Sequence, residues 1–482
     1  MKYSVSVIII AYNTEKYIKD CLDSVLSQDL ENFEIVIVDN ASKDNTAKII
    51  TARIKEKNNV NFIKSAENLG GAAAGNLGIR NAQGEYVFLM DSDDIMPKGT
   101  LRALYRCAKH DDCDVVIGRA KSIYGKKIRN LKFKFYSIPY SFVGVHHGYS
   151  HCRELLISPF YWGKLYKTEF LRNNNVYMPE KALYADLYFS TKALKYARTI
   201  AVCDHLSYLW RRFESTDAHS SITNAAGQVE NFSERLQSYY DLETLFTDDE
   251  ELRLIRVYNL VRLLIPVKSV NLDDTFAQFY FRKMREYLEK VSFEEIANCP
   301  FLTAKKKILC CLMKQNRFDE FVEISDPHFV LNTYNQGDFV SVYDISQPAN
   351  IPSGLLQYTL QKPQNCSLMD ITKTSDAYHM NCVVNAPSEN RCRFLRAVVL
   401  EDDGREKYVA NLEREAADRS PGSFAFSIPK QVIQKFPVFK RYRISVEFLF
   451  NDNFSSVRLT HSGQAVSISR NLIGVTINNR CF

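Results

Sequence analysis

The chain has 482 residues, of which 46% are hydrophobic and 24% are charged, and its formal net charge is +6. The length allows about three domains, and the composition is that of a folded globular protein, which excludes a disordered chain. The mild positive charge suits an anionic ligand but does not demand a nucleic acid, so no nucleic-acid partner is predicted.

The first hundred residues alternate short apolar runs with amphipathic stretches. The predicted strands are residues 5–10, 34–38, 60–63 and 86–90. The predicted helices are residues 18–26, 46–54 and 71–82. Nearly continuous apolar runs are typical of strands buried on both faces of a parallel sheet. Repeated strand–helix–strand units predict a doubly wound, mostly parallel α/β sheet, which binds ligands outside the carboxyl ends of its strands.

The rest of the chain changes its hydrophobic period twice. Residues 225–345 are mostly helical in pattern and predict a helical linker domain after an α/β domain over residues 1–224. Pro, Gly and Ser mark residues 346–364 as a linker. Apolar and polar residues then alternate, so a β-sandwich is predicted over residues 365–482.

Targeting and cysteine signals are weak. No apolar run approaches the ~18 residues that a membrane span needs, and no signal-peptide cleavage site is recognisable. The twelve cysteines include no CxxC pair. They therefore indicate reduced thiols and a cytoplasmic location, with peripheral association at the inner face of the membrane left open.

Acidic residues follow two of the predicted strands. Asp39 comes directly after residues 34–38, and Asp91, Asp93 and Asp94 follow residues 86–90. Two carboxylates one residue apart in a turn can converge on one hard cation, which can bridge two phosphate oxygens. A carboxylate one strand away can accept hydrogen bonds from a base or ribose. The alternative is that these aspartates cap helices, but the turn is too acid-rich for capping alone.

Several motifs in this order resemble the family 2 glycosyltransferases, which have the GT-A fold. They lie at residues 7–13, 34–44, 68–70, 75–79 and 84–94. The resemblance covers about the first 220 residues and is specific because several motifs recur at family spacing. The overall layout is similar to wall teichoic acid glycosyltransferases, which carry immunoglobulin-like domains at the C-terminus. This similarity in layout implies that the predicted sandwich is immunoglobulin-like.

The resemblance implies a nucleotide-sugar donor with UDP as the nucleotide. Ala11, Tyr12 and Asp39 are implied to hold uracil and ribose. Asn68 and Asn76 are implied to approach the nucleotide.

The same family places an Asp-x-Asp motif at the diphosphate. Asp91 and Asp93 match it, with Ser92 between them as a further nucleotide-sugar contact, and Asp93 is implied to bind a divalent metal, Mn²⁺ or Mg²⁺. One departure is Gly75, where many members carry an arginine.

Residues 162–167 and 185–189 resemble the acceptor side of the family. Asp186 is implied to be the general base, which removes the proton from the acceptor hydroxyl as that oxygen attacks the anomeric carbon with inversion. Ala185 departs from the family, which has a glutamate there. The alternative is that Asp186 is an ordinary aspartate at a helix start.

Two basic regions complete the prediction. The resemblance implies that Arg212 and His219 lie near the donor diphosphate, where they would stabilise the leaving group; the alternative is a solvated loop. Residues 119–134 carry seven basic residues and no acidic one. This segment either steers an anionic acceptor or is a charged loop without a ligand.

The predicted function is the inverting transfer of a sugar from a nucleotide-diphosphate donor to a hydroxyl of a bacterial surface polysaccharide or teichoic-acid-like polymer. A nucleotidyltransferase is one alternative, although no glycine follows the first strand as its phosphate loop would require. A polymer-binding scaffold with an inactive transferase domain is another, favoured by Ala185 and Gly75 and opposed by the intact aspartates. The C-terminal domain is predicted to bind polymer or to form a homo-oligomer.

Overall fold

The computed structural model describes residues 1–131, 134–213, 229–264, 274–299, 302 and 304–325, together with the later strands β10 to β22. It divides into two compact units, Met1–Asn259 and Leu260–Phe482. The first unit therefore continues beyond residue 224 and includes the helix α7 (Val229–Glu243).

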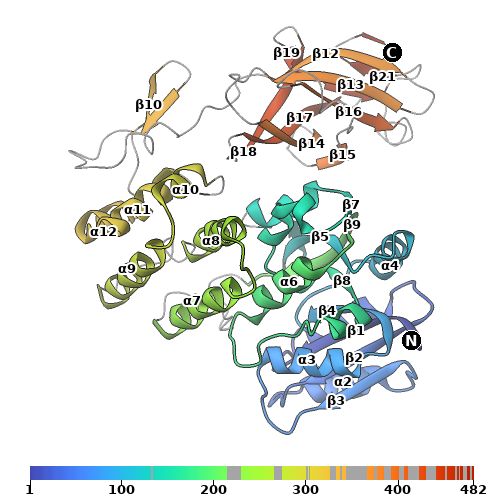
Figure 1. Cartoon of the computed structure of the whole chain (residues 1–482). Helices are drawn as coiled ribbons and strands as arrows, with labels where there is room; N and C mark the ends of the chain where they lie inside the picture. Colours follow the sequence, from blue (N-terminus) through green and yellow to red (C-terminus); the bar gives the residue numbers. More distant parts are fainter. Residues whose placement is uncertain are drawn as a thin grey trace. The chain divides into compact units, whose positions relative to one another are not determined.

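The first four strands form a parallel sheet in the order β3-β2-β1-β4, as predicted (Figure 1). The strands are β1 (Tyr3–Ala11), β2 (Phe33–Asp39), β3 (Val60–Lys64) and β4 (Gly84–Asp91). The helices between them are α1 (Ile18–Leu26), α2 (Thr46–Ile54) and α3 (Gly71–Asn81). Every residue of β2 is buried, which explains its continuous Val and Ile run.

Small residues let α3 lie close against β1. A Cβ atom at Gly78 would come within 2.3 Å of Ile8 Cγ2. A Cβ atom at Gly75 would lie 3.2 Å from both Ile10 Cδ1 and Met178 Cε. A larger side chain at Gly75 would therefore require the Ile10 or Met178 side chain to shift.

The sheet continues in a mixed pattern. β8 (Lys164–Lys167) runs antiparallel between β4 and β5 (Val115–Tyr124), and β9 (Ile200–Arg211) runs parallel to β5. The remaining strands are β6 (Lys127–Arg129), paired with β5, and β7 (Gly144–His146), paired with β9. The helices of this half are α4 (Thr100–His110), α5 (Thr168–Asn173) and α6 (Ala185–Tyr196). The α/β prediction is confirmed, but the sequence did not predict the antiparallel insertion of β8.

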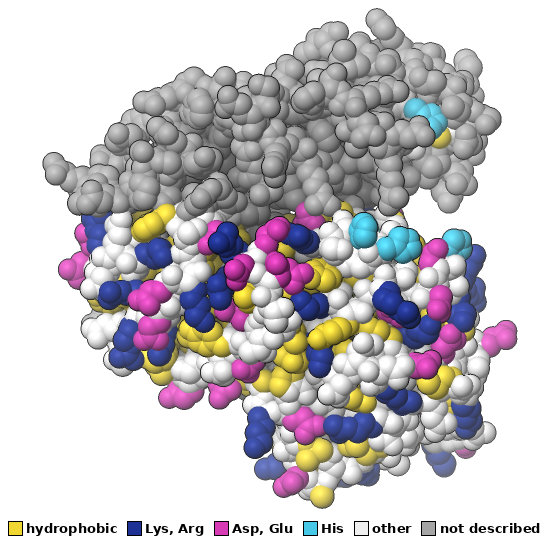
Figure 2. Space-filling model, viewed as in Figure 1, with side chains coloured by type: hydrophobic (Ala, Val, Ile, Leu, Met, Phe, Trp, Pro, Cys, Tyr) yellow, Lys and Arg dark blue, Asp and Glu magenta, His cyan; other side chains and the backbone are white. Residues whose placement is uncertain are grey.

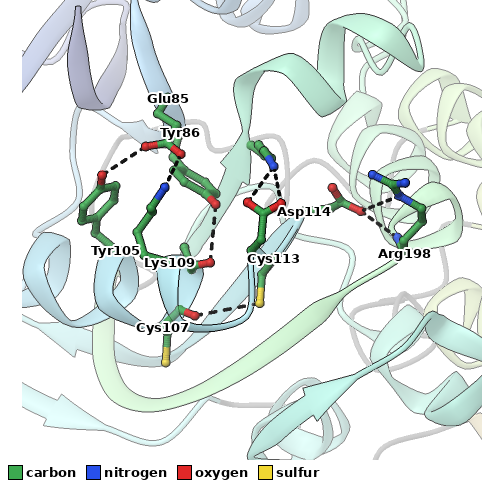
Figure 3. A network of polar contacts seen from close by, with 11 residues as sticks. Glu85, Tyr86, Tyr105, Cys107, Lys109, Cys113, Asp114 and Arg198 are labelled. Atoms are coloured by element: carbon green, nitrogen blue, oxygen red, sulfur yellow. Dashed lines mark hydrogen bonds and ion pairs between the residues drawn. The ribbon is translucent and has the colours of Figure 1, made fainter. Parts of the chain in front are cut away.

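Polar contacts fix the amino ends of β4 and β5, opposite the predicted site (Figure 3). Glu85 accepts hydrogen bonds from Tyr105 (3.1 Å) and Lys109 (2.8 Å) of α4. The buried Asp114 accepts one from the backbone N–H of Arg198 (2.8 Å), just before β9. These contacts hold the connections at this edge and leave the carboxyl ends of the strands for a ligand.

Helices follow the sheet, as predicted. After α7 come α8 (Asp249–Leu263), α9 (Asp274–Leu288), α10 (Phe293–Asn298), α11 (Ala304–Lys314) and α12 (Phe318–Ser325). A hairpin of β10 (Thr333–Gln336) and β11 (Phe339–Val342) then lies inside the stretch that was predicted as helical. Its aromatic and β-branched residues favour strands. Within the described residues, no helix combines the length and apolar character that crossing a membrane requires.

The C-terminal part is a β region. Its strands are β12 (Cys366–Lys373), β13 (Ala377–Val384), β14 (Cys392–Leu400), β15 (Glu406–Ala410), β16 (Ser423–Pro429), β17 (Arg441–Phe450), β18 (Asn453–His461), β19 (Gln464–Ala465), β20 (Ser467–Arg470), β21 (Val475–Ile477) and β22 (Arg480–Cys481). β18 pairs with both β17 and β12 and so joins two sets of strands. The immunoglobulin-like assignment of this region stays a prediction.

Candidate active site

Two loops meet at the carboxyl ends of β1 and β2. Ala11 and Asp39 are direct partners in the parallel register, so the predicted base- and ribose-binding residues lie side by side. The Asp39 carboxylate accepts a hydrogen bond from the backbone N–H of Ser42 (3.2 Å) and is buried, while Tyr12 is 41% exposed. The predicted triad thus combines a fixed carboxylate with an accessible aromatic ring.

The same two loops are tied together by hydrogen bonds. Asn13 donates from its backbone N–H to Ser42 Oγ (3.0 Å) and accepts from Lys43 N–H through Oδ1 (2.8 Å). Asn13 and Ala41 both have positive φ, 52° and 60°, a conformation that costs free energy outside glycine and marks a constrained loop. The sequence analysis did not foresee this strain.

Asn68 and Asn76 have different surroundings. The Asn68 side chain is exposed, and its Oδ1 accepts hydrogen bonds from Asn40 Nδ2 and Gly70 N–H, both at 2.9 Å. Asn76 is buried. Its Nδ2 donates a hydrogen bond to the backbone oxygen of Met178 (2.8 Å), and its Oδ1 accepts one from the Met178 N–H (2.9 Å). Asn76 therefore holds the 178–180 segment to α3, whereas Asn68 lies at the loop surface.

The turn after β4 carries the predicted Asp-x-Asp motif. Ser92 is buried, and its Oγ lies 2.9 Å from Thr14 Oγ1, so this turn is fixed to the loop after β1. Asp94 accepts hydrogen bonds from the Tyr208 hydroxyl (2.5 Å) and the Arg211 N–H (2.6 Å). Arg211 Nε also donates to the backbone oxygen of Asp93 (2.6 Å). β9 thus holds the turn from the other side.

The carboxylates of this turn affect one another. Burial and the Asp93 and Asp186 carboxylates raise the pKa of Asp91 to about 7, although a hydrogen bond from the Tyr161 hydroxyl opposes the rise. Burial and the charges of Asp93 and Asp91 likewise raise the pKa of Asp94. A cation beside these groups would relieve their mutual repulsion.

The residues present fit a divalent metal that is shared with a substrate. Within the described residues, no three or more His, Cys, Asp or Glu side chains are arranged to hold a metal ion by themselves. Mn²⁺ or Mg²⁺ prefers oxygen ligands, and Mg²⁺ is commonly bound by one or two carboxylates plus substrate phosphates. Asp93, which is half-buried, would hold the ion together with diphosphate oxygens.

Asp186 reaches this site from α6. It lies in the first turn of the helix, where the helix dipole favours a negative charge. Its charge contributes to the raised pKa of both Asp91 and Tyr161, which places the predicted base near the Asp-x-Asp turn. Ala185 is buried, so the alanine at this family position avoids the desolvation of a glutamate side chain.

Tyr161 and Lys164 lie beside the candidate site; Tyr161 was not predicted, and Lys164 was predicted only as part of the acceptor-side motif at residues 162–167. Tyr161 donates its hydroxyl hydrogen to Asp91, and burial and the Asp91 carboxylate raise the pKa of this phenol well above its usual value. Lys164 is buried and donates to Ser158 Oγ (3.2 Å) and to the Phe160 backbone oxygen. Burial lowers the pKa of Lys164 to about 7, although the charge of Asp186 opposes this shift.

Arg212 lies over an aromatic cluster. Its guanidinium carbon is 4.2 Å from the centroid of the Trp210 ring, and Trp210 in turn contacts Trp162 and Phe160, with centroids 5.7 and 5.4 Å apart. Trp162 also stacks on Tyr208 at 4.5 Å. The predicted partner of Arg212, His219, lies outside the described residues. A role for Arg212 at the diphosphate stays a prediction.

Comparisons with known proteins find matches in the first part of the chain. Residues 6–170 match the family model described as glycosyl transferase family 2. A glycosyltransferase of Streptococcus pneumoniae serotype 4, GlyG, is 42% identical over 119 residues, which cover 24% of this chain and 39% of that protein. The poly(ribitol-phosphate) beta-N-acetylglucosaminyltransferase TarS of Staphylococcus aureus is 31% identical over 214 residues, which cover 44% of this chain and 35% of TarS. The matches thus span well under half of these relatives.

Solved structures share the fold. The crystal structure of S. aureus TarS matches with a TM-score of 0.56 and 16% identity, covering 99% of this chain and 85% of TarS. A structure of TarS residues 1–349 in complex with UDP-GlcNAc matches with a TM-score of 0.55 and 20% identity, covering 72% of this chain and 98% of that one. At these identities the likeness shows a GT-A architecture and no substrate.

Proposed function

Because residues 6–170 are a family 2 glycosyltransferase domain, we propose that the protein transfers a sugar from a UDP-sugar to a hydroxyl of a bacterial surface polymer. A polyol-phosphate polymer is the preferred acceptor, because the curated relative TarS is described as acting on poly(ribitol-phosphate). A UDP-sugar donor is favoured by the TarS structure with UDP-GlcNAc. A nucleotide-sugar donor favours a cytoplasmic site of action, as the sequence predicts.

The observation that carries the proposal is the meeting of three carboxylate groups from different elements. Asp39 ends β2, Asp91 ends β4 and is followed by the turn to Asp94, and Asp186 lies in the first turn of α6. Parallel strands bring the first two to one edge of the sheet, where ligands of such folds bind. The contribution of the Asp186 charge to the raised pKa of Asp91 supports Asp186 as the base candidate at that edge.

Each residue then has a role in the transfer. Asp39 accepts hydrogen bonds from the uridine part of the donor, and Asp93 faces its diphosphate. A bound divalent metal would supply neutralisation of the leaving diphosphate. Asp186 accepts the proton of the acceptor hydroxyl while that oxygen attacks the anomeric carbon, with inversion. Tyr161 holds Asp91 in place through its hydroxyl.

The test is donor turnover by the full-length chain. UDP release from a panel of UDP-sugars is measured with Mn²⁺ or Mg²⁺, for wild type and for Asp93→Asn and Asp186→Asn. Removing a charge that acts in the transition state slows a reaction by about 10²–10⁴-fold. Both variants are therefore expected to release UDP at least about 10²-fold more slowly than wild type. Glu31→Gln removes an exposed carboxylate next to the amino end of β2 and serves as the control with unchanged rate.

Three results would count against the proposal in different ways. Wild type that releases no nucleotide, with or without polymer, would favour the scaffold alternative. Release of pyrophosphate during nucleotide transfer would favour a nucleotidyltransferase. Full activity of Asp186→Asn would remove this residue as the base and leave the donor site intact.

A further inference from the structure

A short hairpin beside the site carries cations. β5 and β6 pair antiparallel, with Ser122 opposite Arg129 and Tyr124 opposite Lys127. All three residues of β6 are exposed, and so is Lys126 in the turn. The hairpin extends β5 at its carboxyl end, the same edge of the sheet at which the candidate site lies.

These cations have no acidic partner. Within the described residues, no ion pair involves Lys126, Lys127 or Arg129, and Arg129 instead lies 5.3 Å from the centroid of the Tyr124 ring. Elsewhere in the first unit, many exposed cations are paired, for example Arg53 with Asp23. Figure 2 shows basic and acidic side chains interspersed over the described surface. A run of unpaired cations departs from that mixture and favours an anionic ligand.

The strand register places two of these cations, Lys127 and Arg129, on the face of the sheet that carries the aromatic cluster around Trp210. Alternate strand residues share a face, so Lys127 and Arg129 lie on one face with their partners Tyr124 and Ser122. Ser122 is also opposite Trp210 of β9, which carries Arg212 above its ring. Two strand spacings separate the backbones of Arg129 and Trp210, about 10 Å.

This face leads to the proposed acceptor side. The Trp210 ring contacts Phe160 and Trp162, and the residue between these two, Tyr161, donates to Asp91. The backbone N–H of Arg212 donates to the Ile123 oxygen (2.9 Å), which fixes the end of β9 to the hairpin strand. The strand β5, with which the cation-bearing β6 pairs, is thus joined to β9.

We propose that Lys127 and Arg129 on the β5–β6 hairpin bind phosphate groups of a polyol-phosphate acceptor chain, whose reacting unit lies at Asp186. The inference rests on the proposed function and adds a binding surface for the acceptor. Repeated phosphates match cations spaced along a strand, and arginine suits phosphate recognition because its fork can donate two hydrogen bonds.

A membrane surface is the competing occupant. The one large apolar side chain exposed on β6 is Ile128, which lies on the opposite face from Lys127 and Arg129. Anionic lipid binding through a hairpin would use cations and apolar side chains together at one surface. The separation of the two kinds of side chain on opposite faces therefore favours a polymer.

Direct binding tests the inference without requiring turnover. A fluorescent ribitol-phosphate oligomer is titrated with full-length protein, and anisotropy gives Kd at low salt and at about 0.15 M salt. Lys127→Gln/Arg129→Gln is expected to weaken binding roughly three- to thirtyfold and to reduce its salt dependence, because two phosphate contacts are lost. Lys55→Gln/Lys57→Gln removes two exposed cations next to the amino end of β3 and is expected to leave Kd unchanged.

Unchanged binding in the hairpin variant, or equal weakening in both double variants, would overturn the inference. The inference would also be overturned if the protein bound vesicles with anionic lipids but not the oligomer, and if the hairpin variant lost this vesicle binding. UDP release without acceptor is measured in parallel and is expected to equal wild type in the hairpin variant. If wild type releases no UDP but binds the oligomer through the hairpin, the proposed function fails while the surface stands.

Discussion

At the residue scale, Lys164 is a buried lysine beside the candidate site. Its Nζ is enclosed with the Ser158 hydroxyl and the Phe160 carbonyl, and burial lowers its pKa to about 7 from an ordinary value of 10.5. A buried ammonium costs free energy unless its partners compensate. Lys164 holds the loop that carries Tyr161. The free-energy cost of burying the Lys164 ammonium therefore accompanies the fixing of this tyrosine beside the candidate site.

The lowered pKa predicts a pH-dependent stability. Between about pH 7 and 10.5 the unfolded chain keeps the Lys164 proton while the folded chain releases it, so this group makes the protein more stable as pH rises, by up to about 1.4 kcal/mol per pH unit. Below pH 7 both states are protonated and the full penalty remains. The Lys164→Met variant has no titrating group at this position. The free energy of unfolding of wild type should therefore rise relative to that of the variant between pH 7 and pH 10.

Urea denaturation at pH 7, 8.5 and 10 measures the difference. Lys57→Met, at an exposed position, is the control and should follow wild type at every pH. Parallel stability curves for Lys164→Met and wild type would contradict the prediction, because they would mean that Lys164 titrates alike in the folded and unfolded chains.

The candidate-site residues that lie at the ends of apolar strands could be placed in the fold from the sequence. Asp39, Asp91 and Asp93 follow apolar strands, and the fold brings them to one edge for the reason the pattern predicts. Tyr161 had no such signal. Lys164 lies in the acceptor-side motif at residues 162–167, but its buried contacts could not be predicted, because they depend on how the 158–163 loop packs. Their contacts are tertiary and leave no spacing in the chain.

At the element scale, α3 illustrates how small residues determine a close approach. Gly78 faces Ile8, which is fully buried in the middle of β1. Gly78→Ala places a Cβ 2.3 Å from Ile8 Cγ2, so the helix or the strand has to move. Such overpacking typically costs about 1–3 kcal/mol, which exceeds the gain in helix propensity from Gly to Ala.

The same substitution at Gly71 is the matched control. Gly71 is the first residue of α3, and a Cβ there meets no atom within 4 Å. Gly71→Ala should be neutral or stabilising by up to about 1 kcal/mol. The measurement is the free energy of unfolding in urea at one pH. Equal stability of the two variants would show that α3 shifts freely over β1.

Elements were predicted best where one period persists. The alternating strands and helices up to residue 91 agree with the structure within a few residues, because buried parallel strands read as apolar runs. β8 could not be predicted, because a four-residue strand has too few positions for a period and its antiparallel direction follows from neighbours far away in the chain. The β10–β11 hairpin was not predicted, because its strands are also too short to show a period.

At the scale of the whole molecule, the division into two compact units has a thermodynamic consequence. The residues of the candidate site all belong to Met1–Asn259. A ligand that binds only the folded form of this unit stabilises it by mass action, about 2.7 kcal/mol at 100 times Kd. UDP with Mn²⁺ should therefore raise the melting temperature of one transition by several degrees and leave a second transition unchanged.

Differential scanning calorimetry of the full-length chain checks this expectation. Asp93→Asn should retain both transitions and lose the metal-dependent part of the shift, because the variant lacks the carboxylate that is proposed to bind the metal. A single transition that moves as a whole would contradict it and show that the two units unfold cooperatively.

The insertion of β8 also constrains how the site is made during synthesis. The parallel strands β1 to β4 involve neighbouring segments and can pair as soon as residue 91 has left the ribosome. β5 cannot join them through β8 until residues 164–167 emerge, and Arg211 comes later still. For this interval the acidic turn after β4 has neither Tyr161 nor Arg211 beside it. The nascent chain therefore carries the paired strands β1, β2 and β4 before the residues that hold the acidic turn, and these contacts are complete only when β9 has been translated.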